Sequence, residues 1–243
     1  MNELSTANAI SQLGAPDKDV RVAAALHLGK VADASSVDAL LRALAAEPEL
    51  YVRETLTWAL VRLGHTAVAP LIQMLASSDP AWRNHAAHVI GKMGADDAVD
   101  SLIQTLADTD ATVRMKATLS LGQIGNPKTI PFLIQRFGDA DSMVQSTVNT
   151  ALEQFGAAAI DPLIGALHDS REWVRKQAAE VLGLLANDRA TPALAQLLTD
   201  EHAEVRFAAM SALHDIGSPS ARRAMRTAIN DADVRVRALA GRG

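Results

Sequence analysis

The sequence contains no cysteine and very few aromatic residues. Cysteine is absent from all 243 residues, and phenylalanine, tryptophan and tyrosine together make up 3% of the chain. Without cysteine the chain can form no disulfide, no cysteine-ligated zinc site and no iron–sulfur cluster, and it has no thiol nucleophile. Hydrophobic residues nevertheless make up 49% of the sequence, so alanine, leucine and valine must build most of the core.

The chain also lacks an excess of positive charge and any long hydrophobic run. Its formal net charge of -5 at pH 7 argues against a dedicated nucleic-acid binder, which usually needs a basic surface. No window reaches the roughly 18 uninterrupted apolar residues of a membrane span. Residues 1–4 offer no basic start of a secretory signal. We therefore predict a cytoplasmic protein that does not associate with membranes.

What the sequence does contain is an internal repeat, which is the first property to test because a missed repeat misassigns the whole fold. A Val-Arg pair, or a close variant of it, recurs through the chain. We take its second residue as position 0 of each repeat. These residues are Arg21, Arg53, Arg83, Arg114, Gln145, Arg175, Arg206 and Arg237, so the steps between them are 32, 30, 31, 31, 30, 31 and 31 residues.

Two further positions follow the same period. A small residue stands eleven residues after position 0, in the set Ala32, Gly64, Gly94, Gly125, Gly156, Ala186 and Gly217. Aspartate stands six residues before it in five copies, which are Asp108, Asp139, Asp169, Asp200 and Asp231. The agreement of seven steps to within one or two residues indicates repeats rather than chance.

Each repeat has the pattern of two helices. Positions +3, +7 and +10 are apolar, as in Ala117, Leu121 and Ile124, which is the spacing of one helical face. The small residue at +11 is typical of a helix end in the left-handed conformation. A second helix carries apolar residues at −15, −12, −11 and −8, as in Val99, Leu102, Ile103 and Leu106. Proline is expected in its first turn, at Pro70, Pro131, Pro162 and Pro192.

One helix pair cannot bury its apolar face alone, so the pairs must stack into a solenoid. The predicted fold is all-α, with about seven two-helix repeats of ~31 residues in a single domain over residues 1–243. A lone helix is expected near 4–13 and half a repeat at the C-terminus. First helices are expected to start near residues 20, 52, 82, 113, 144, 174 and 205.

The motif resembles the HEAT-like repeats of bacterial phycobilin-lyase-type proteins. It is carried by Val113-Arg114, Ala117, Leu121-Gly122, Ile124-Gly125, Ile130-Pro131, Leu133-Ile134 and Asp139, and similar runs cover nearly the whole chain. The resemblance implies a right-handed α-α superhelix with first helices on its convex side and second helices on its concave side. It also implies a hydrogen-bonded ladder in which the position 0 arginine of one repeat meets a loop aspartate.

Two features depart from this pattern. The fifth copy has Gln145 in place of arginine and Glu153 where other copies have glycine, so a ladder would be interrupted there. Either a change of curvature near residues 140–156 or sequence drift without consequence would account for it. No polar capping repeat closes either end, so another chain covers the ends or they are frayed.

Sequence motifs of the common enzyme classes are absent. There is no GxGxxG, HExxH or GxSxG run, and no histidine is followed directly by glutamate, the dipeptide on which diiron hydroxylases of HEAT-repeat architecture rely. His85 and His88 share a helix face and form a weak candidate metal pair, with Glu54 as the nearest further ligand. Ordinary surface histidines are the favoured interpretation. We predict no catalytic residue and no cofactor, while the sequence leaves an enzymatic role open.

A row of glutamines is the first candidate binding surface. Position −10 of the second helix lies opposite its apolar stripe at 100° per residue. In the middle of the chain this position holds Gln73, Gln104, Gln135, Gly165 and Gln196. Glutamine can both donate and accept hydrogen bonds, which suits a bound peptide backbone. The alternative is that glutamine is simply a good helix former at a solvated position.

A second candidate surface lies on the first helices. Position +5 holds Leu26, Trp58, His88 and Leu119 in the first four copies and small or polar residues later. Exposed apolar stripes often mark interfaces, and tryptophan is a frequent anchor in them. The alternative is that neighbouring helices cover this stripe.

A basic cluster marks the C-terminal end. Arg222, Arg223 and Arg226 lie within about one helical turn, in a stretch that carries six arginines against two aspartates. Such a cluster can meet an acidic partner or nucleic acid, or it can be a solvated end face.

The interpretation favoured by these features is a non-catalytic scaffold or adaptor that binds a protein partner through the glutamine row, the Trp58-centred stripe, or both. A bilin-lyase-type accessory subunit, which the resemblance implies, is the first alternative. A HEAT-type nucleic-acid binder is the second, although the acidic charge weighs against it.

Overall fold

The computed structural model describes residues 5–242, and every regular element in them is a helix. The prediction about a secretory signal in residues 1–4 therefore lies outside the described residues, as does the first residue of the helix expected near 4–13. Within the described range no helix is long and apolar enough to cross a membrane. The chain divides into two compact units, Met1–Ile124 and Gly125–Gly243.

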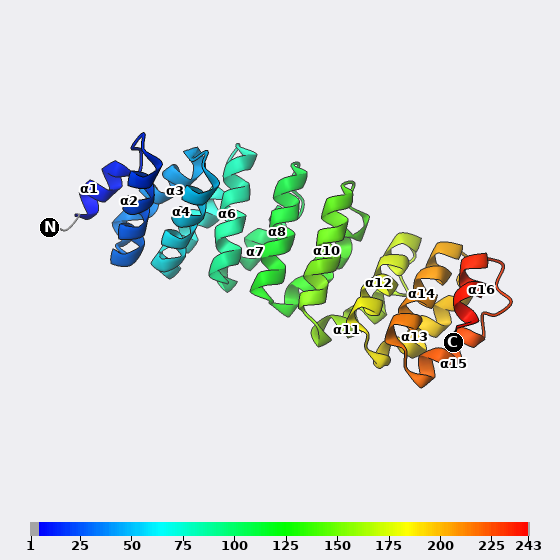
Figure 1. Ribbon diagram of the computed structural model, residues 1–243. Helices are drawn as coiled ribbons and strands as arrows, with labels where there is room; N and C mark the ends of the chain where they lie inside the picture. The colour runs from blue at the N-terminus through cyan, green and yellow to red at the C-terminus, as the bar shows by residue number, and fades with distance from the viewer. Residues whose placement is uncertain (1–4, 243) are drawn as a thin grey trace. The chain divides into compact units, whose positions relative to one another are not determined.

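The first unit consists of two layers of helices (Figure 1). One layer is formed by the first helices α2 (Lys18–Val31), α4 (Leu50–Leu63), α6 (Pro80–Met93) and α8 (Ala111–Ile124). The other is formed by α1 (Thr6–Gln12), α3 (Val37–Ala46), α5 (Val68–Met74) and α7 (Val99–Thr105). Each of these packs on the first helix that follows it. Short 3-10 turns, η1 (Ala34–Ser36), η2 (Gly64–Ala67) and η3 (Asp96–Ala98), lead into α3, α5 and α7.

The second unit repeats this arrangement. Its first helices are α10 (Ser142–Gln154), α12 (Glu172–Leu185), α14 (Ala203–Ile216) and the short α16 (Val234–Ala240). Its second helices are α9 (Ile130–Ile134), α11 (Ala157–Ala166), α13 (Thr191–Gln196) and α15 (Pro219–Arg226). The 3-10 turns are η4 (Pro127–Thr129), η5 (Gln135–Gly138), η6 (Asp188–Ala190) and η7 (Leu197–Thr199). Pro162 lies inside α11 and not in a first turn as predicted, because α11 begins directly after Gly156 with no separate 3-10 turn.

First helices begin two residues before the predicted starts because an aspartate caps many of them. Asp17, Asp79, Asp141 and Asp233, at position −4, each accept a hydrogen bond from a backbone N–H of the first turn. The residue at position +11 follows the end of each first helix and has a positive φ in all seven copies, although α10 already ends two residues before it. Ala32 and Ala186 adopt this conformation as well as the glycines, with φ of 53° and 47°.

The core consists mainly of the predicted alanine and leucine positions. Ala117 and Leu121 of α8 are fully buried, as is Leu102 of α7. Position −11, predicted to belong to the core, is half-buried instead, as at Ile103. Position +10 is likewise half-buried at Ile124. Both positions lie at the edges of the apolar stripe, where the neighbouring layer covers only one side of the side chain.

Glycine at position +8 lets neighbouring first helices approach closely. A Cβ at Gly29 would lie 2.9 Å from the Cα of Ala59 in α4, and one at Gly183 would lie 3.0 Å from the Cα of Ala212 in α14. The pairs α2–α4, α6–α8 and α12–α14 are accordingly the most closely packed neighbours among the described helices. Where position +8 is Val61 or Glu153, the packing of α4 on α6 and of α10 on α12 is looser.

Candidate functional site

An arginine near the start of a first helix ties two loops together in several repeats. The Nη1 atom of Arg83 donates to the carbonyl oxygens of Ser77 and Ser78, in its own loop, at 2.9 and 3.2 Å. Its Nε and Nη2 atoms donate to the two carboxylate oxygens of Asp108, in the next loop, at 2.6 and 2.7 Å. The same bidentate arrangement joins Arg21 to Glu47, Arg175 to Asp200 and Arg206 to Asp231.

These ladder carboxylates are occupied by structural contacts. The side chains of Arg83 and Asp108 are 12% and 9% exposed. Burial alone would raise the pKa of Asp108, but the hydrogen bonds from Arg83 and from the backbone N–H of Asp110 outweigh burial and lower it. The hydrogen bond from Arg21 likewise lowers the pKa of Glu47. Ionised, doubly paired carboxylates of this kind stabilise the junctions between repeats.

The ladder is interrupted at two places. Gln145 donates to the carbonyl oxygen of Asp139 at 2.6 Å and reaches no carboxylate among the described residues. Asp169, which stands in the next loop, is bound by Arg171 instead, at 2.9 Å to each oxygen. The second interruption, at Arg53, was not foreseen from the sequence: the loop after it carries Ser77 where an acidic residue would stand. Both interruptions fall in the two repeats whose step is 30 residues.

Hollows recur between successive second helices, in register with the repeat. They lie between α1 and α3 (about 530 Å³), α5 and α7 (about 390 Å³), and α11 and α13 (about 500 Å³). Each has a leucine at position −8 on the earlier helix, namely Leu13, Leu75 or Leu167. Each also has a ladder carboxylate at one end, namely Glu47, Asp108 or Asp200. A fourth hollow of about 330 Å³, between α3 and α5, ends at Ser77 and Trp82.

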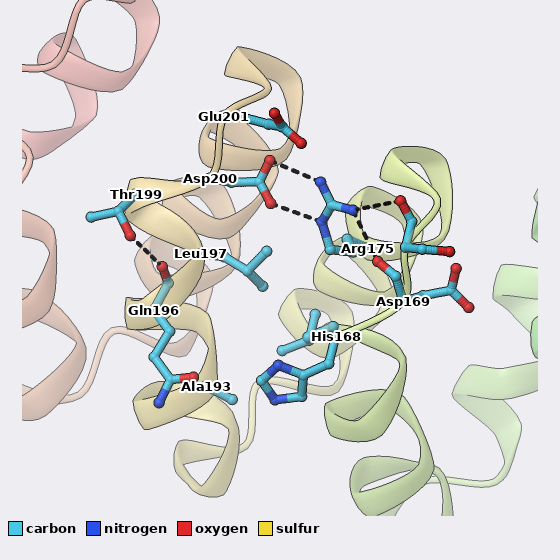
Figure 2. A pocket seen from close by; sticks show the side chains of 11 residues that line it. His168, Asp169, Arg175, Ala193, Gln196, Leu197, Thr199, Asp200 and Glu201 are labelled. Atoms are coloured by element: carbon cyan, nitrogen blue, oxygen red, sulfur yellow. Dashed lines mark hydrogen bonds and ion pairs between the residues drawn. The ribbon is translucent and has the colours of Figure 1, made fainter.

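Three of the four predicted glutamines line these hollows. Gln73 lines the α3–α5 hollow, Gln104 the α5–α7 hollow and Gln196 the α11–α13 hollow. Figure 2 shows Gln196 among the residues that line the α11–α13 hollow, with the Arg175–Asp200 pair above it. Gln135 is also exposed. At Gly165 the row has no side chain, and a Cβ placed there would contact nothing within 4 Å.

A row of half-buried isoleucines runs beside the glutamines and was missed in the sequence. Position −11 holds Ile72 and Ile103 in the first unit and Ile134 and Ile164 in the second, and all four are partly exposed. The helical pattern assigns this position to the core, so its exposure depends on how far the neighbouring helix reaches. We use the name second-helix face for the glutamine and isoleucine rows together, taken within each unit.

The stripe at position +5 is only partly exposed. Trp58 and Leu26 are 39% and 37% exposed, while His88 and Leu119 are half-buried. The ring of Trp58 lies against Gly29 of the preceding first helix. Trp58 therefore has a packing role between α2 and α4, which leaves its outer edge as the part that a partner can contact.

The candidate metal pair lies on half-buried positions of α6. The Nε2 atom of His88 lies 3.5 Å from a carboxylate oxygen of Glu54. Burial, followed by the charge of Arg53, lowers the pKa of His85, and burial followed by Lys116 lowers that of His88. Among the described residues no group of three His, Asp or Glu side chains is arranged to hold a metal ion.

The basic cluster at the C-terminal end lies on and beside α15. Arg222, Arg223 and Arg226 are all exposed. Other arginines of the same stretch are engaged: Arg235 binds Asp233 and Glu204 and lies over the ring of Phe207, and Arg237 binds loop carbonyls. Within this C-terminal stretch, three exposed arginines thus share one short helix.

Two-helix repeats joined by an arginine–carboxylate ladder define an α-solenoid. The chain belongs to the HEAT-repeat family: the family model for HEAT repeats matches residues 6–82, 68–153 and 160–243. No curated protein matches the sequence.

Solved structures of HEAT-repeat proteins are similar to this chain at low identity. Kap121p is 16% identical with a TM-score of 0.58, over 98% of this chain and 32% of that chain. Importin beta is 13% identical with a TM-score of 0.57, over 96% and 39% of the two chains. The CpcE–CpcF complex of phycocyanin lyase from Nostoc sp. PCC7120 is 24% identical with a TM-score of 0.45, over 98% and 96%. Identities this low show the fold alone, an all-α HEAT-repeat solenoid.

Proposed function

We propose that this protein is a non-catalytic scaffold that binds a segment of a protein partner along the second-helix face. The observation that supports the proposal is the register of the hollows. In the three hollows that contain them, Gln73, Gln104 and Gln196 stand on the wall with their amides accessible. Solenoids commonly bind their partners along repeating surfaces of this kind.

The chemistry of the face suits a polypeptide. Each glutamine amide offers donors and an acceptor, which can pair with a peptide backbone in either direction. The half-buried isoleucines add apolar area that a partner side chain can cover. Glu47, Asp108 and Asp200, at the ends of three of the hollows, are already paired with arginines.

Photo-crosslinking tests the proposal. A photoreactive amino acid at position 104 or 196 should give the same adduct from a lysate of the source cells. A control at Lys92, which is exposed on a first helix, should not give it. Replacing Gln73 and Gln104 by alanine should reduce the adduct at least about fivefold, with the circular dichroism spectrum unchanged. Equal labelling from positions 92, 104 and 196 would refute a role for this face.

The Trp58-centred stripe is the second part of the proposal. Since Trp58 also packs on Gly29, its removal would disturb the fold together with any interface. Leu26→Gln is the better probe, because Leu26 is exposed and the change keeps a helix-forming side chain. Loss of the partner from this variant, with an unchanged melting temperature, would support the stripe.

The finer assignment of the repeats to the phycobilin-lyase type, and a cytoplasmic location, also remain proposals. An accessory role of the bilin-lyase type predicts a shift in the visible absorption of an added tetrapyrrole, which a titration would reveal. Binding of nucleic acid through Arg222, Arg223 and Arg226 predicts a salt-dependent shift in DNA mobility. Cell fractionation would test the location.

A further inference from the structure

Arg53 is held in the same way as the ladder arginines. Its Nη1 atom donates to the carbonyl oxygens of Glu47 and Pro48 at 2.9 and 2.7 Å. Arg83 binds the two equivalent carbonyls of its own loop. By analogy with Arg83, whose Nε and Nη2 atoms bind the carboxylate of the next loop, we expect the same edge of Arg53 to face Ser77.

That next loop offers Arg53 no carboxylate at the ladder position, and its Asp79 side chain accepts the backbone N–H of Ala81 instead. Ser77 stands at the ladder position, and its Oγ accepts the backbone N–H of Asp79 at 3.2 Å, as Asp108 accepts that of Asp110 at 2.8 Å. A serine side chain takes over this local contact but is too short to provide the bidentate acceptor. Among residues 5–242 no acceptor forms a hydrogen bond with Nε or Nη2 of Arg53.

Ser77 lines the α3–α5 hollow, so a ligand in the second-helix face can reach this position. The hollow has Gln73 on one wall and Arg42 on the other, with Trp82 at its end. Arg42 is exposed and makes no ion pair within the described residues. Among the residues that line the hollow, Asp38 is the one carboxylate and Arg42 the one cation.

The interruption at Gln145 behaves differently. Opposite Gln145 the carboxylate of Asp169 is retained and the arginine is lost, and Arg171 supplies a guanidinium from two residues away. The second unit thus completes its interrupted position with its own side chain. At Arg53 the described residues offer no such substitute.

We propose that an aspartate or glutamate side chain of a bound protein segment completes the ladder at Arg53, reaching it past Ser77 from the α3–α5 hollow. A carboxylate is favoured because four arginines of this chain bind carboxylates in that geometry at 2.6–3.1 Å. A bidentate arginine–carboxylate pair of this kind adds orientation as well as affinity. The inference rests on the proposed function in one respect, that the carboxylate belongs to a segment bound on the second-helix face.

Nuclear magnetic resonance can observe this site directly. The arginine Nε–H signals of the 15N-labelled full chain are followed while blocked acetyl-Ala-Glu-Ala-amide is added, and Arg53→Lys assigns the Arg53 signal. A saturable shift of that signal is expected with the glutamate peptide. The glutamine analogue of the peptide should bind at least about tenfold more weakly.

Ser77→Asp and Ser77→Asn form the matched pair of variants. The aspartate should complete the ladder from within, raise the melting temperature by about 2 °C or more and abolish the peptide-induced shift. The asparagine has the same size without the charge and should keep it. The inference is overturned by an equal response of the two variants, by the absence of a saturable shift, or by inorganic phosphate binding as tightly as the glutamate peptide.

The result is separable from the test of the proposed function. Gln104→Ala changes the second-helix face one repeat away, and the Arg53 shift should persist in it even where the partner is lost. Loss of the partner with the Arg53 shift intact would refute only the glutamine row. Retention of the partner without an Arg53 shift would refute only this inference.

Discussion

The guanidinium of Arg83 clamps the carboxylate of Asp108 through two hydrogen bonds across 25 residues of sequence. The same guanidinium binds two carbonyl oxygens of the loop before its own helix. One side chain therefore binds acceptors in two successive loops and holds neighbouring repeats together. The arginine at position 0 recurs in the sequence for this structural reason.

Removing the carboxylate of a ladder pair should lower the free energy of unfolding by more than the loss of an exposed carboxylate does. Asp108→Ala leaves a guanidinium that is 12% exposed without its counter-charge, and we expect the free energy of unfolding to fall by about 2–4 kcal/mol. Asp38→Ala, at an exposed carboxylate, should change it by less than about 0.5 kcal/mol. Urea denaturation of the two variants and the wild type measures the difference. Similar values for the two variants would show that the ladder contributes little.

The paired carboxylates also predict loss of stability in acid. Hydrogen bonds from Arg171 lower the pKa of Asp169 to about 2, and those from Arg206 lower the pKa of Asp231. A carboxyl whose pKa is lower in the folded chain binds protons more tightly in the unfolded chain. Its contribution to the free energy of unfolding is therefore complete above about pH 5 and declines as the pH falls from about 4 towards 2. Melting temperatures between pH 2 and 6 at constant ionic strength should follow this course.

Asp169→Asn serves as the control for the acid effect. It removes one of the titrating groups, so the melting temperature should fall at pH 6 and depend less steeply on pH below 4. A melting temperature that rises on acidification of the wild type would contradict the assignment.

The close approach of α2 and α4 depends on Gly29. A Cβ at this position would overlap the ring of Trp58 and lie 2.9 Å from the Cα of Ala59, so the helices would have to separate. Gly29→Ala should lower the free energy of unfolding by about 1–3 kcal/mol. Gly165→Ala is the matched substitution, since nothing lies within 4 Å of its Cβ, and it should raise that energy by about 0.5–1 kcal/mol through helix propensity. Chemical denaturation would reveal the opposite signs, and a stabilised Gly29→Ala would refute the packing argument.

Local features of the sequence were sufficient to predict the fold. The helix pairs follow from the apolar spacing and from the residue at +11, and the HEAT-repeat assignment confirms them. The exposure of Gln73, Gln104, Gln135 and Gln196 also agrees with the prediction, because position −10 lies opposite the stripe on any helix.

Features that depend on the distance between helices could not be predicted in this way. To predict that Trp58 packs on Gly29, the distance between α2 and α4 must be known. To predict that Ile103 is partly exposed, it must be known how much of its side chain the neighbouring helix covers. The ladder role of Glu47 was missed because the pattern was defined by aspartate, although the longer glutamate spans the same gap. A pattern of carboxylates, rather than of aspartates, would have found it.

In the two 30-residue repeats, the glycine at position +11 adopts a backbone conformation that the other repeats do not use. Gly64 and Gly156 have φ of 58° and 53° with ψ of −139° and −125°, whereas Gly94 has φ of 62° and ψ of 35°. The turns after Gly64 and Gly156 are one residue shorter, and the chain reverses there through a backbone conformation close to the region that is essentially restricted to glycine. The conformation of Gly94 is one that Ala32 and Ala186 already adopt.

Gly156→Ala should therefore be more costly than Gly94→Ala, although a Cβ at either position would contact nothing within 4 Å. We expect a loss of about 2–3 kcal/mol at Gly156 and of about 1 kcal/mol at Gly94. Since steric contacts are matched, the difference reports the backbone conformation alone, and denaturant titration of the two variants measures it. Equal losses would mean that the short turn tolerates alanine, in which case the shorter step would impose no requirement for glycine.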